Sequence, residues 1–144
     1  MTRYLSAETI LVLHSEVIDA SGGSHGVRET GLLAALAEKP RASFGGTDLY
    51  PDLFTKAAVY LEAVANYRVF IDGNKRTSFV VAARFLFENG YDFVADDEAI
   101  VSFMLEVARD KTAIADIAVW LRTHARKIQA RKNARAAKPR GKKR

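Results

Sequence analysis

The sequence predicts an all-α fold in which about six helices pack around one buried helix. Three observations lead to this class. Apolar residues recur three and four positions apart in successive segments, and glycine or proline interrupts these segments at intervals typical of ordinary helices. In addition, Arg84 is the single charge between Thr77 and Glu88. A helix that is apolar on nearly every side is expected at the centre of a domain.

The expected helices can be placed from their caps and from the residues that interrupt them. Ser6 is a suitable N-cap for a first helix, and the glycine-rich stretch 21–24 ends it. Pro40 closes a second helix, Pro51 suits the first position of a third, and Gly90 suits a left-handed cap after the fourth. The expected helices cover residues 6–20, 29–39, 51–67, 74–88, 96–109 and 112 through 120, with a short strand at 91–94 and an exposed loop at 41–50.

The length and composition exclude several classes of protein. With 144 residues, 49% of them hydrophobic, the chain suits one folded domain and is too apolar for general disorder. It has no cysteine, which excludes disulfides and any thiolate metal site or nucleophile. No apolar run approaches the roughly 18–20 residues of a membrane helix, and no signal-peptide pattern opens the sequence. We therefore expect a soluble cytoplasmic protein that makes no membrane contact.

The charge is divided unevenly along the chain. Residues 122–144 hold eleven of the 22 Lys and Arg residues and none of the 17 acids, which leaves the first 121 residues with a net charge of −6. We therefore divide the chain into an acidic domain, 1–124, and a basic tail, 125–144. The tail is either a weak nucleic-acid contact or a solvated terminus, and it lacks aromatic residues for base stacking.

The candidate functional segment is the polar turn directly before the apolar fourth helix. It contains Asp72, Gly73, Asn74, Lys75 and Arg76 in consecutive positions. Backbone N–H groups without partners at a helix N-terminus attract anions, and the two bases add full positive charges there. A carboxylate is the hard oxygen ligand that Mg²⁺ prefers. The turn therefore suits a nucleotide polyphosphate together with its metal ion.

An ordinary helix start would use the same residue types. Asp72 could be an N-cap, Gly73 a turn residue, and Lys75 and Arg76 a solvated first turn. Against this interpretation, bases at a helix N-terminus oppose the helix dipole and require another explanation. The residues alone leave both interpretations open.

The same segment resembles the signature of a known family. Residues 70–77 (FIDGNKRT) are similar to the core of the Fic/Doc pattern H-x-F-x-(D/E)-(G/A)-N-(G/K)-R, and Lys75 in the G/K position resembles the Doc branch of toxins. Further likeness lies at residues 5–18, 27–36 and 44–58, so that the resemblance covers most of residues 4–95.

This resemblance implies a Fic fold and a kinase-like reaction. In Doc-like members, the γ-phosphate of ATP moves to a threonine of elongation factor Tu, which halts translation. Carried over to this chain, Asp72 would hold Mg²⁺. The residues that would cradle the phosphates, through side chains or backbone N–H groups, are Gly73, Asn74, Lys75, Arg76 and Thr77.

The resemblance also implies a flap and a regulatory partner. The flap would align a segment of the target protein by backbone pairing, and it would consist of Phe44, Gly45, Gly46, Thr47 and Asp48. A separate Phd-like antitoxin would restrain the toxin, since no inhibitory (S/T)-x-x-x-E-(G/N) motif is present in this sequence.

Arg68 departs from the family pattern at its most important position. The pattern has a histidine there, which is the general base that takes the proton from the attacking hydroxyl. Arginine cannot replace it, because its guanidinium group stays protonated at working pH. Loss of a general base typically lowers the rate about 100- to 10,000-fold. We therefore predict a Doc-type phosphotransferase that is catalytically crippled, whether Arg68 is natural or introduced. The remaining alternative, a site that works without a histidine, is the one that the residues favour least.

Two other functions remain open from the sequence. One is an AMP-transferring Fic enzyme, although Lys75 argues against it because this position is thought to influence the orientation of ATP. The other is a non-catalytic relative that retains only antitoxin or nucleic-acid binding, which Arg68 favours. The three histidines lie outside the motif, and His14 is expected to be a packed or capping residue rather than a metal ligand.

Overall fold

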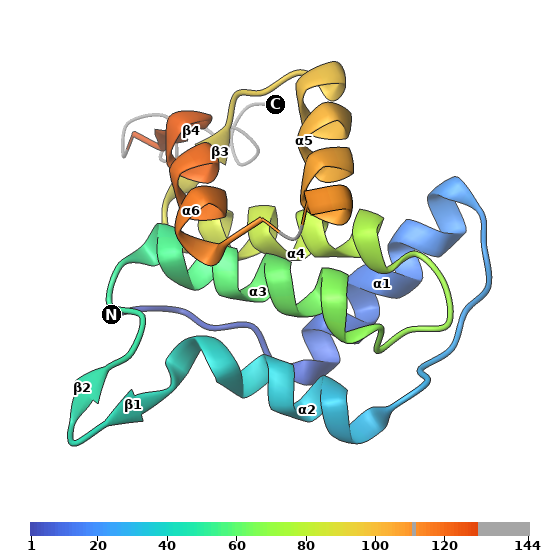
Figure 1. Ribbon diagram of the computed structural model, residues 1–144, viewed down its shortest axis with the longest axis horizontal. Helices are drawn as coiled ribbons and strands as arrows, with labels where there is room; N and C mark the ends of the chain where they lie inside the picture. The colour runs from blue at the N-terminus through green and yellow to red at the C-terminus, as the bar shows by residue number, and fades with distance from the viewer. Residues whose placement is uncertain (111, 130–144) are drawn as a thin grey trace, which may run out of the picture.

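Two consecutive antiparallel helices, α3 (Leu53–Tyr67) and α4 (Asn74–Glu88), form the centre of the protein (Figure 1). The computed structural model describes residues 1–110 and 112–129. Within these residues the other helices surround the central pair, and they are α1 (Ala7–Ser21), α2 (Thr30–Glu38), the short 3₁₀ helix η1 (Lys39–Arg41), α5 (Asp97–Asp110) and α6 (Ile114–Thr123). The prediction of an all-α fold of about six helices is confirmed.

The strands form two small antiparallel pairs. The first is a hairpin of β1 (Ser43–Phe44) and β2 (Thr47–Asp48), in the segment that we expected to be a loop. The second joins β3 (Tyr91–Phe93) to β4 (Ala125–Lys127), and only β3 was expected. The first three residues of the predicted tail therefore pair with the folded domain. Residues 130–144, on which most of the predicted nucleic-acid contact depends, lie outside the described part of the chain.

The most buried helix is not the one that we expected. Ten residues of α3 are buried, compared with six residues of α4. The reason is that α3 is covered by α2, α4, α6 and η1, whereas one apolar side of α4 remains partly uncovered. Phe79 and Val80 on α4 are half-buried, and Phe87 is exposed. An apolar helix surface indicates that covering it is favourable. It does not indicate whether another helix of the same chain or a different protein covers it.

The helix boundaries agree with the expectations to within a few residues. The fourth helix covers the predicted residues 74–88, and α2 ends at Glu38, just before Pro40. The third helix begins at Leu53 instead of Pro51, because Asp52 is its N-cap and accepts a hydrogen bond from the Thr55 N–H at 3.0 Å. No helix within residues 1–110 and 112–129 is long and apolar enough to span a membrane.

Candidate functional site

The candidate site is a cleft at the junction of α3 and α4. Its volume is about 680 Å³, and its walls come from the last turns of α3, the loop 68–73, the first turn of α4 and Ala108 of α5. The loop leaves α3 at Arg68 and enters α4 through Gly73. The structure therefore brings together six of the residues that the sequence singled out, namely Arg68, Asp72, Gly73, Asn74, Lys75 and Arg76.

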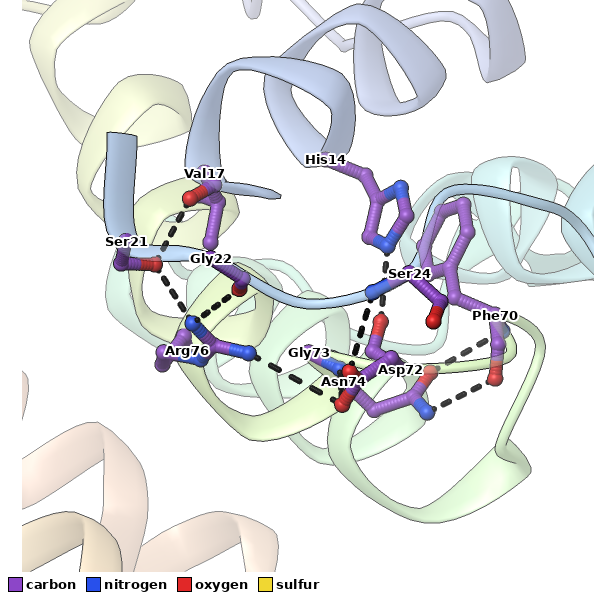
Figure 2. A network of polar contacts seen from close by, with 10 residues as sticks. All are labelled: His14, Val17, Ser21, Gly22, Ser24, Phe70, Asp72, Gly73, Asn74 and Arg76. Carbon is purple, nitrogen blue, oxygen red and sulfur yellow. Dashed lines mark hydrogen bonds and ion pairs between the residues drawn. The ribbon is translucent and has the colours of Figure 1, made fainter. Parts of the chain in front are cut away.

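The Asn74 side chain forms two hydrogen bonds to the backbone of Phe70, four residues earlier in the chain. Its side-chain Oδ1 accepts a hydrogen bond from the Phe70 N–H at 3.0 Å, and its Nδ2 donates to the Phe70 carbonyl at 2.9 Å (Figure 2). This paired contact ties the loop to the start of α4, so the Asn74 amide is already engaged. The first helical bond of α4 runs from the Thr77 N–H to the Gly73 carbonyl, which leaves the N–H groups of residues 74–76 directed out of the helix start.

Asp72 is held by backbone donors on both carboxylate oxygens. Oδ1 accepts from the Gly73 N–H at 2.8 Å, and Oδ2 accepts from the Ser24 N–H at 3.1 Å (Figure 2). These bonds, with a smaller contribution from the Arg76 charge, hold the pKa of Asp72 below its ordinary value of 3.8. The N-cap of α4 is Gly73, with φ 75°, and no side chain caps the helix. Asp72 is therefore an ionised, half-exposed carboxylate in the cleft, and the interpretation of it as an ordinary N-cap is wrong.

Arg76 links the turn to the end of α1. Its guanidinium group donates to the Ser21 hydroxyl and to the Gly22 carbonyl at 3.0 Å, and it lies 3.8 Å from Asp72 Oδ1 (Figure 2). The side chain still borders the cleft and is 42% exposed. Arg76 therefore has a structural task that the sequence did not indicate, in addition to the positive charge that it places at the site.

Lys75 and Arg68 are the unengaged cations of the cleft. Within the described part of the chain, neither side chain has an ion-pair or hydrogen-bond partner, and both are exposed. Arg68 ends α3 with φ 57° and ψ 45°, and it is the only described residue other than glycine with a positive φ. Its backbone thus adopts a conformation that L-residues rarely occupy. Two unengaged positive charges and an ionised carboxylate face the same open space.

A histidine from outside the motif contacts it, and nothing in the sequence placed it there. His14 of α1 is 1% exposed, its Nε2 lies 2.7 Å from the Asp72 carbonyl oxygen, and its ring stacks on Phe70 at 3.8 Å between ring centroids (Figure 2). The prediction that it is a packed residue rather than a metal ligand is consistent with this position. The only sequence signal was a polar residue on the buried side of an apolar helix, and that signal does not name its partner.

Thr77 does not reach the cleft. It was expected to help hold the nucleotide, but it is fully buried beneath the first turn of α4 and lines no wall of the cleft. Its hydroxyl has no hydrogen-bond partner among the described residues. The helical periodicity places position 77 on the side of α4 that faces the core, which the motif alone could not reveal.

The proposed flap lies far from the cleft. Residues 44–48 precede α3, whereas the motif follows it, so the hairpin and the motif loop are at opposite ends of this helix (Figure 1). An α-helix of 15 residues is about 22 Å long. Lys56 fixes the hairpin there, because its buried ammonium contacts the Asp48 carboxylate at 3.3 Å and the Pro40 carbonyl at 3.4 Å. The structure therefore does not bring these five residues together with the motif.

The described residues contain no group of three or more side chains that could hold a metal ion by themselves. This agrees with the way Mg²⁺ usually binds, through one or two carboxylates, water and the phosphate oxygens of a substrate. Asp72 has the required oxygen donors and is ionised. The donor set therefore fits a Mg²⁺ ion that arrives with a nucleotide.

Comparisons with known proteins show which family the chain belongs to. The model of the Fic/DOC family matches residues 4–86. The chain belongs to the Fic/Doc family. It is 43% identical over 96 residues to the protein named Toxin Doc of Mycolicibacterium smegmatis, and the aligned residues cover 67% of this chain and 72% of that protein. It is 31% identical over 120 residues to the protein named Protein kinase doc of Escherichia phage P1, and the aligned residues cover 83% of this chain and 94% of that protein.

The family match of this Fic/Doc protein spans α1 to α4, which carry all the contacts of the turn described above. Beside the cleft is a second groove of about 470 Å³ between α1, α4 and α5. Its walls are apolar and include Val17, Phe79, Val101 and Leu105, while Lys75 and Arg76 border both this groove and the cleft. An apolar surface thus continues directly from the charged turn.

Proposed function

We propose that the cleft binds a magnesium–nucleotide, ATP, and that the protein is a Doc-type toxin whose active form transfers the γ-phosphate. The observation that carries this proposal is the convergence of an ionised carboxylate, two unengaged cations and the outward N–H groups of one helix start. Phosphates are bound by charges and backbone N–H groups arranged in this way. The names of the two relatives, a Doc toxin and a Doc protein kinase, support the same activity.

The roles of the residues follow from what each of them contacts. Lys75, together with the N–H groups of residues 74–76, would bind the phosphates, and Asn74 would maintain the turn that presents those groups. Asp72 would hold Mg²⁺, which supplies charge neutralisation and orientation of the phosphates. Arg76 borders the cleft beside Asp72, so a small movement of its guanidinium group would add a further phosphate contact.

We propose that this chain transfers phosphate slowly at best, because none of the described residues around the cleft is a suitable proton acceptor. Arg68 cannot accept a proton. His14 is buried and points to the Asp72 carbonyl. Glu62, the other carboxylate of the cleft, accepts a hydrogen bond from Asn66 at 3.1 Å and lies 3.9 Å from Lys39. A catalytic base typically contributes about 100- to 10,000-fold to the rate.

The proposed acceptor is a threonine hydroxyl of a translation factor similar to elongation factor Tu, as the family resemblance implies. Because the hairpin at 44–48 lies at the other end of α3, it would contact a part of the target that is remote from this hydroxyl. Alignment of the acceptor itself would then depend on the walls of the cleft.

Calorimetry and mass spectrometry test the proposal in two steps. The parent chain should bind Mg-ATP, and Lys75→Ala should weaken binding at least about tenfold, whereas Arg84→Ala on the exposed side of α4 should not. Arg68→His should then add about 80 Da to the target for phosphate, whereas about 329 Da would indicate AMP transfer instead. Absence of nucleotide binding by both the parent and Arg68→His contradicts the proposed function.

We also propose that the apolar groove between α1, α4 and α5 receives a segment of a Phd-like antitoxin. The membership in a family of Doc toxins supports such a partner, and the groove offers apolar walls that end at Lys75 and Arg76. A bound amphipathic segment would bury those walls and could place an acidic side chain next to the two cations. Such a segment would control the site by covering it.

A further inference from the structure

His14 contacts the motif but has no role of its own in the proposed phosphate transfer. It is a buried imidazole on α1, and both its hydrogen bond to the Asp72 carbonyl and its ring stack on Phe70 are with the motif. The ring plane is within 4° of the Phe70 ring plane, and Nε2 lies 2.7 Å from the Asp72 carbonyl oxygen. A carbonyl oxygen only accepts hydrogen bonds, so Nε2 must carry the hydrogen and act as the donor.

This hydrogen bond fixes the plane of the peptide between Asp72 and Gly73. The described chain has no cis peptide, and in a trans peptide the C=O and N–H groups point in opposite directions. With the carbonyl directed inward to His14, the Gly73 N–H is directed outward, where it donates to Asp72 Oδ1 at 2.8 Å. The bond on the buried side of the peptide therefore determines where the carboxylate lies on the cleft side.

The packing around this peptide leaves little freedom for another arrangement. A Cβ added to Gly73 would lie 2.9 Å from the Ile18 side chain and 3.8 Å from His14 Nε2. Gly73 lies close to α1 and adopts φ 75°, a left-handed conformation that glycine tolerates better than other residues. The inner side of the turn is thus shaped by α1. Among the described residues of α1, His14 is the one whose side chain makes a hydrogen bond to the backbone of the turn.

We propose that His14 is a positioning residue for the nucleotide site, acting through the Asp72 carbonyl to hold the Asp72 carboxylate and the start of α4 in their binding geometry. It touches neither nucleotide nor metal. The expected effect of His14 on nucleotide affinity rests on the proposed function. Its expected effect on the geometry of the turn does not, because that effect can be measured without a ligand.

Two substitutions separate the hydrogen bond from the ring stack. His14→Phe keeps an aromatic ring against Phe70 and removes the donor, whereas His14→Gln keeps an N–H donor of similar reach and removes the ring. We expect His14→Phe to weaken Mg-ATP binding at least about tenfold and His14→Gln to stay within about threefold of the parent. Amide exchange at Gly73 should become about tenfold faster in His14→Phe alone.

Tyr60→Phe is the matched control for stability. It removes another buried hydrogen bond, from the Leu5 N–H to the Tyr60 hydroxyl at 2.9 Å, at a place away from the cleft. This variant should unfold more easily than the parent and bind Mg-ATP with unchanged affinity. A purely structural role for His14 predicts instead that affinity follows thermal stability in all three variants, and that result overturns the proposal.

The remaining outcomes are also decisive. If His14→Phe does not fold, nitrogen NMR of the full-length parent at neutral pH still tests the donor: a hydrogen on Nε2 supports the proposal, and an imidazole protonated only on Nδ1 overturns it. If neither the parent nor Arg68→His binds nucleotide, the proposed function fails, and Gly73 exchange in the variants still decides the role of His14. Unchanged exchange in a folded His14→Phe variant contradicts it.

Discussion

Lys56 and Asp48 form an ion pair in which one partner is buried and the other is half-exposed. The Lys56 side chain is 2% exposed and the Asp48 side chain 51% exposed, with 3.3 Å between Nζ and Oδ2. Lys56 extends from α3 to β2 of the hairpin and to η1, since it also contacts the Pro40 carbonyl at 3.4 Å. Its aliphatic chain lies inside the protein, and the Tyr4 ring lies 5.4 Å from the ammonium group. The two charges should therefore respond differently to removal.

Asp48→Ala should destabilise the protein more than Lys56→Met. Loss of the carboxylate leaves a buried ammonium group with one carbonyl, at a cost of about 2–4 kcal/mol in the free energy of unfolding. Loss of the ammonium group leaves a carboxylate that water can solvate, at a cost below about 1 kcal/mol. Urea denaturation measures the free energy of unfolding of both variants. The control is Glu38→Ala, which breaks an exposed ion pair with Arg41 and should change this free energy by almost nothing. Equal losses for both variants contradict this account.

Replacement of Arg68 by glycine should stabilise the fold. Arg68 has φ 57°, a conformation that costs an L-residue roughly 1 kcal/mol and glycine almost nothing. We expect Arg68→Gly to raise the free energy of unfolding by about 0.5–1 kcal/mol. Arg84→Gly, at an exposed position inside α4, should lower it by a similar amount because glycine is a poor helix former. Thermal and urea unfolding of the two variants should therefore differ from the parent with opposite signs.

The Asp72 carboxylate should contribute to stability at neutral pH and not in strong acid. Its pKa is lower in the folded protein than the ordinary value of 3.8, because the Ser24 and Gly73 N–H groups bond to its charged form. The contribution is therefore complete above about pH 5, and it is lost as the pH falls through the ordinary pKa and then through the lower folded pKa. The difference in unfolding free energy between the parent and Asp72→Asn should be constant from pH 7 to pH 5 and then shrink. A difference that grows on acidification would reverse the sign that we assign.

A charge in the apolar groove should block the antitoxin without affecting the nucleotide. Leu105 on α5 is 61% exposed and forms part of the groove wall. Leu105→Glu should weaken binding of a Phd-like antitoxin at least about tenfold, because a carboxylate would lose water on docking. Val119→Glu is the control, since Val119 is equally exposed at 62% on α6 and lies outside the groove. Equal weakening by both variants would place the antitoxin elsewhere.

The sequence alone predicted the all-α class, most helix boundaries and the turn at residues 72–76. These features are local. Helical periodicity, proline, glycine and capping residues act within a few positions of the chain, and Asn74 reaches only four residues back to Phe70. The family pattern is local in the same sense, because its residues occupy one short segment, and most of that segment lines one part of the cleft.

Only the tertiary structure decided which distant residues contact the motif. His14 lies 58 positions from Asp72 and Ser21 lies 55 positions from Arg76, and no periodicity connects such residues. The same reason explains why Thr77 is buried, why α3 rather than α4 is the most covered helix, and why the hairpin lies a whole helix away from the cleft. A side chain's type and spacing limit what it can do, but the packing of separate helices determines which atoms it meets.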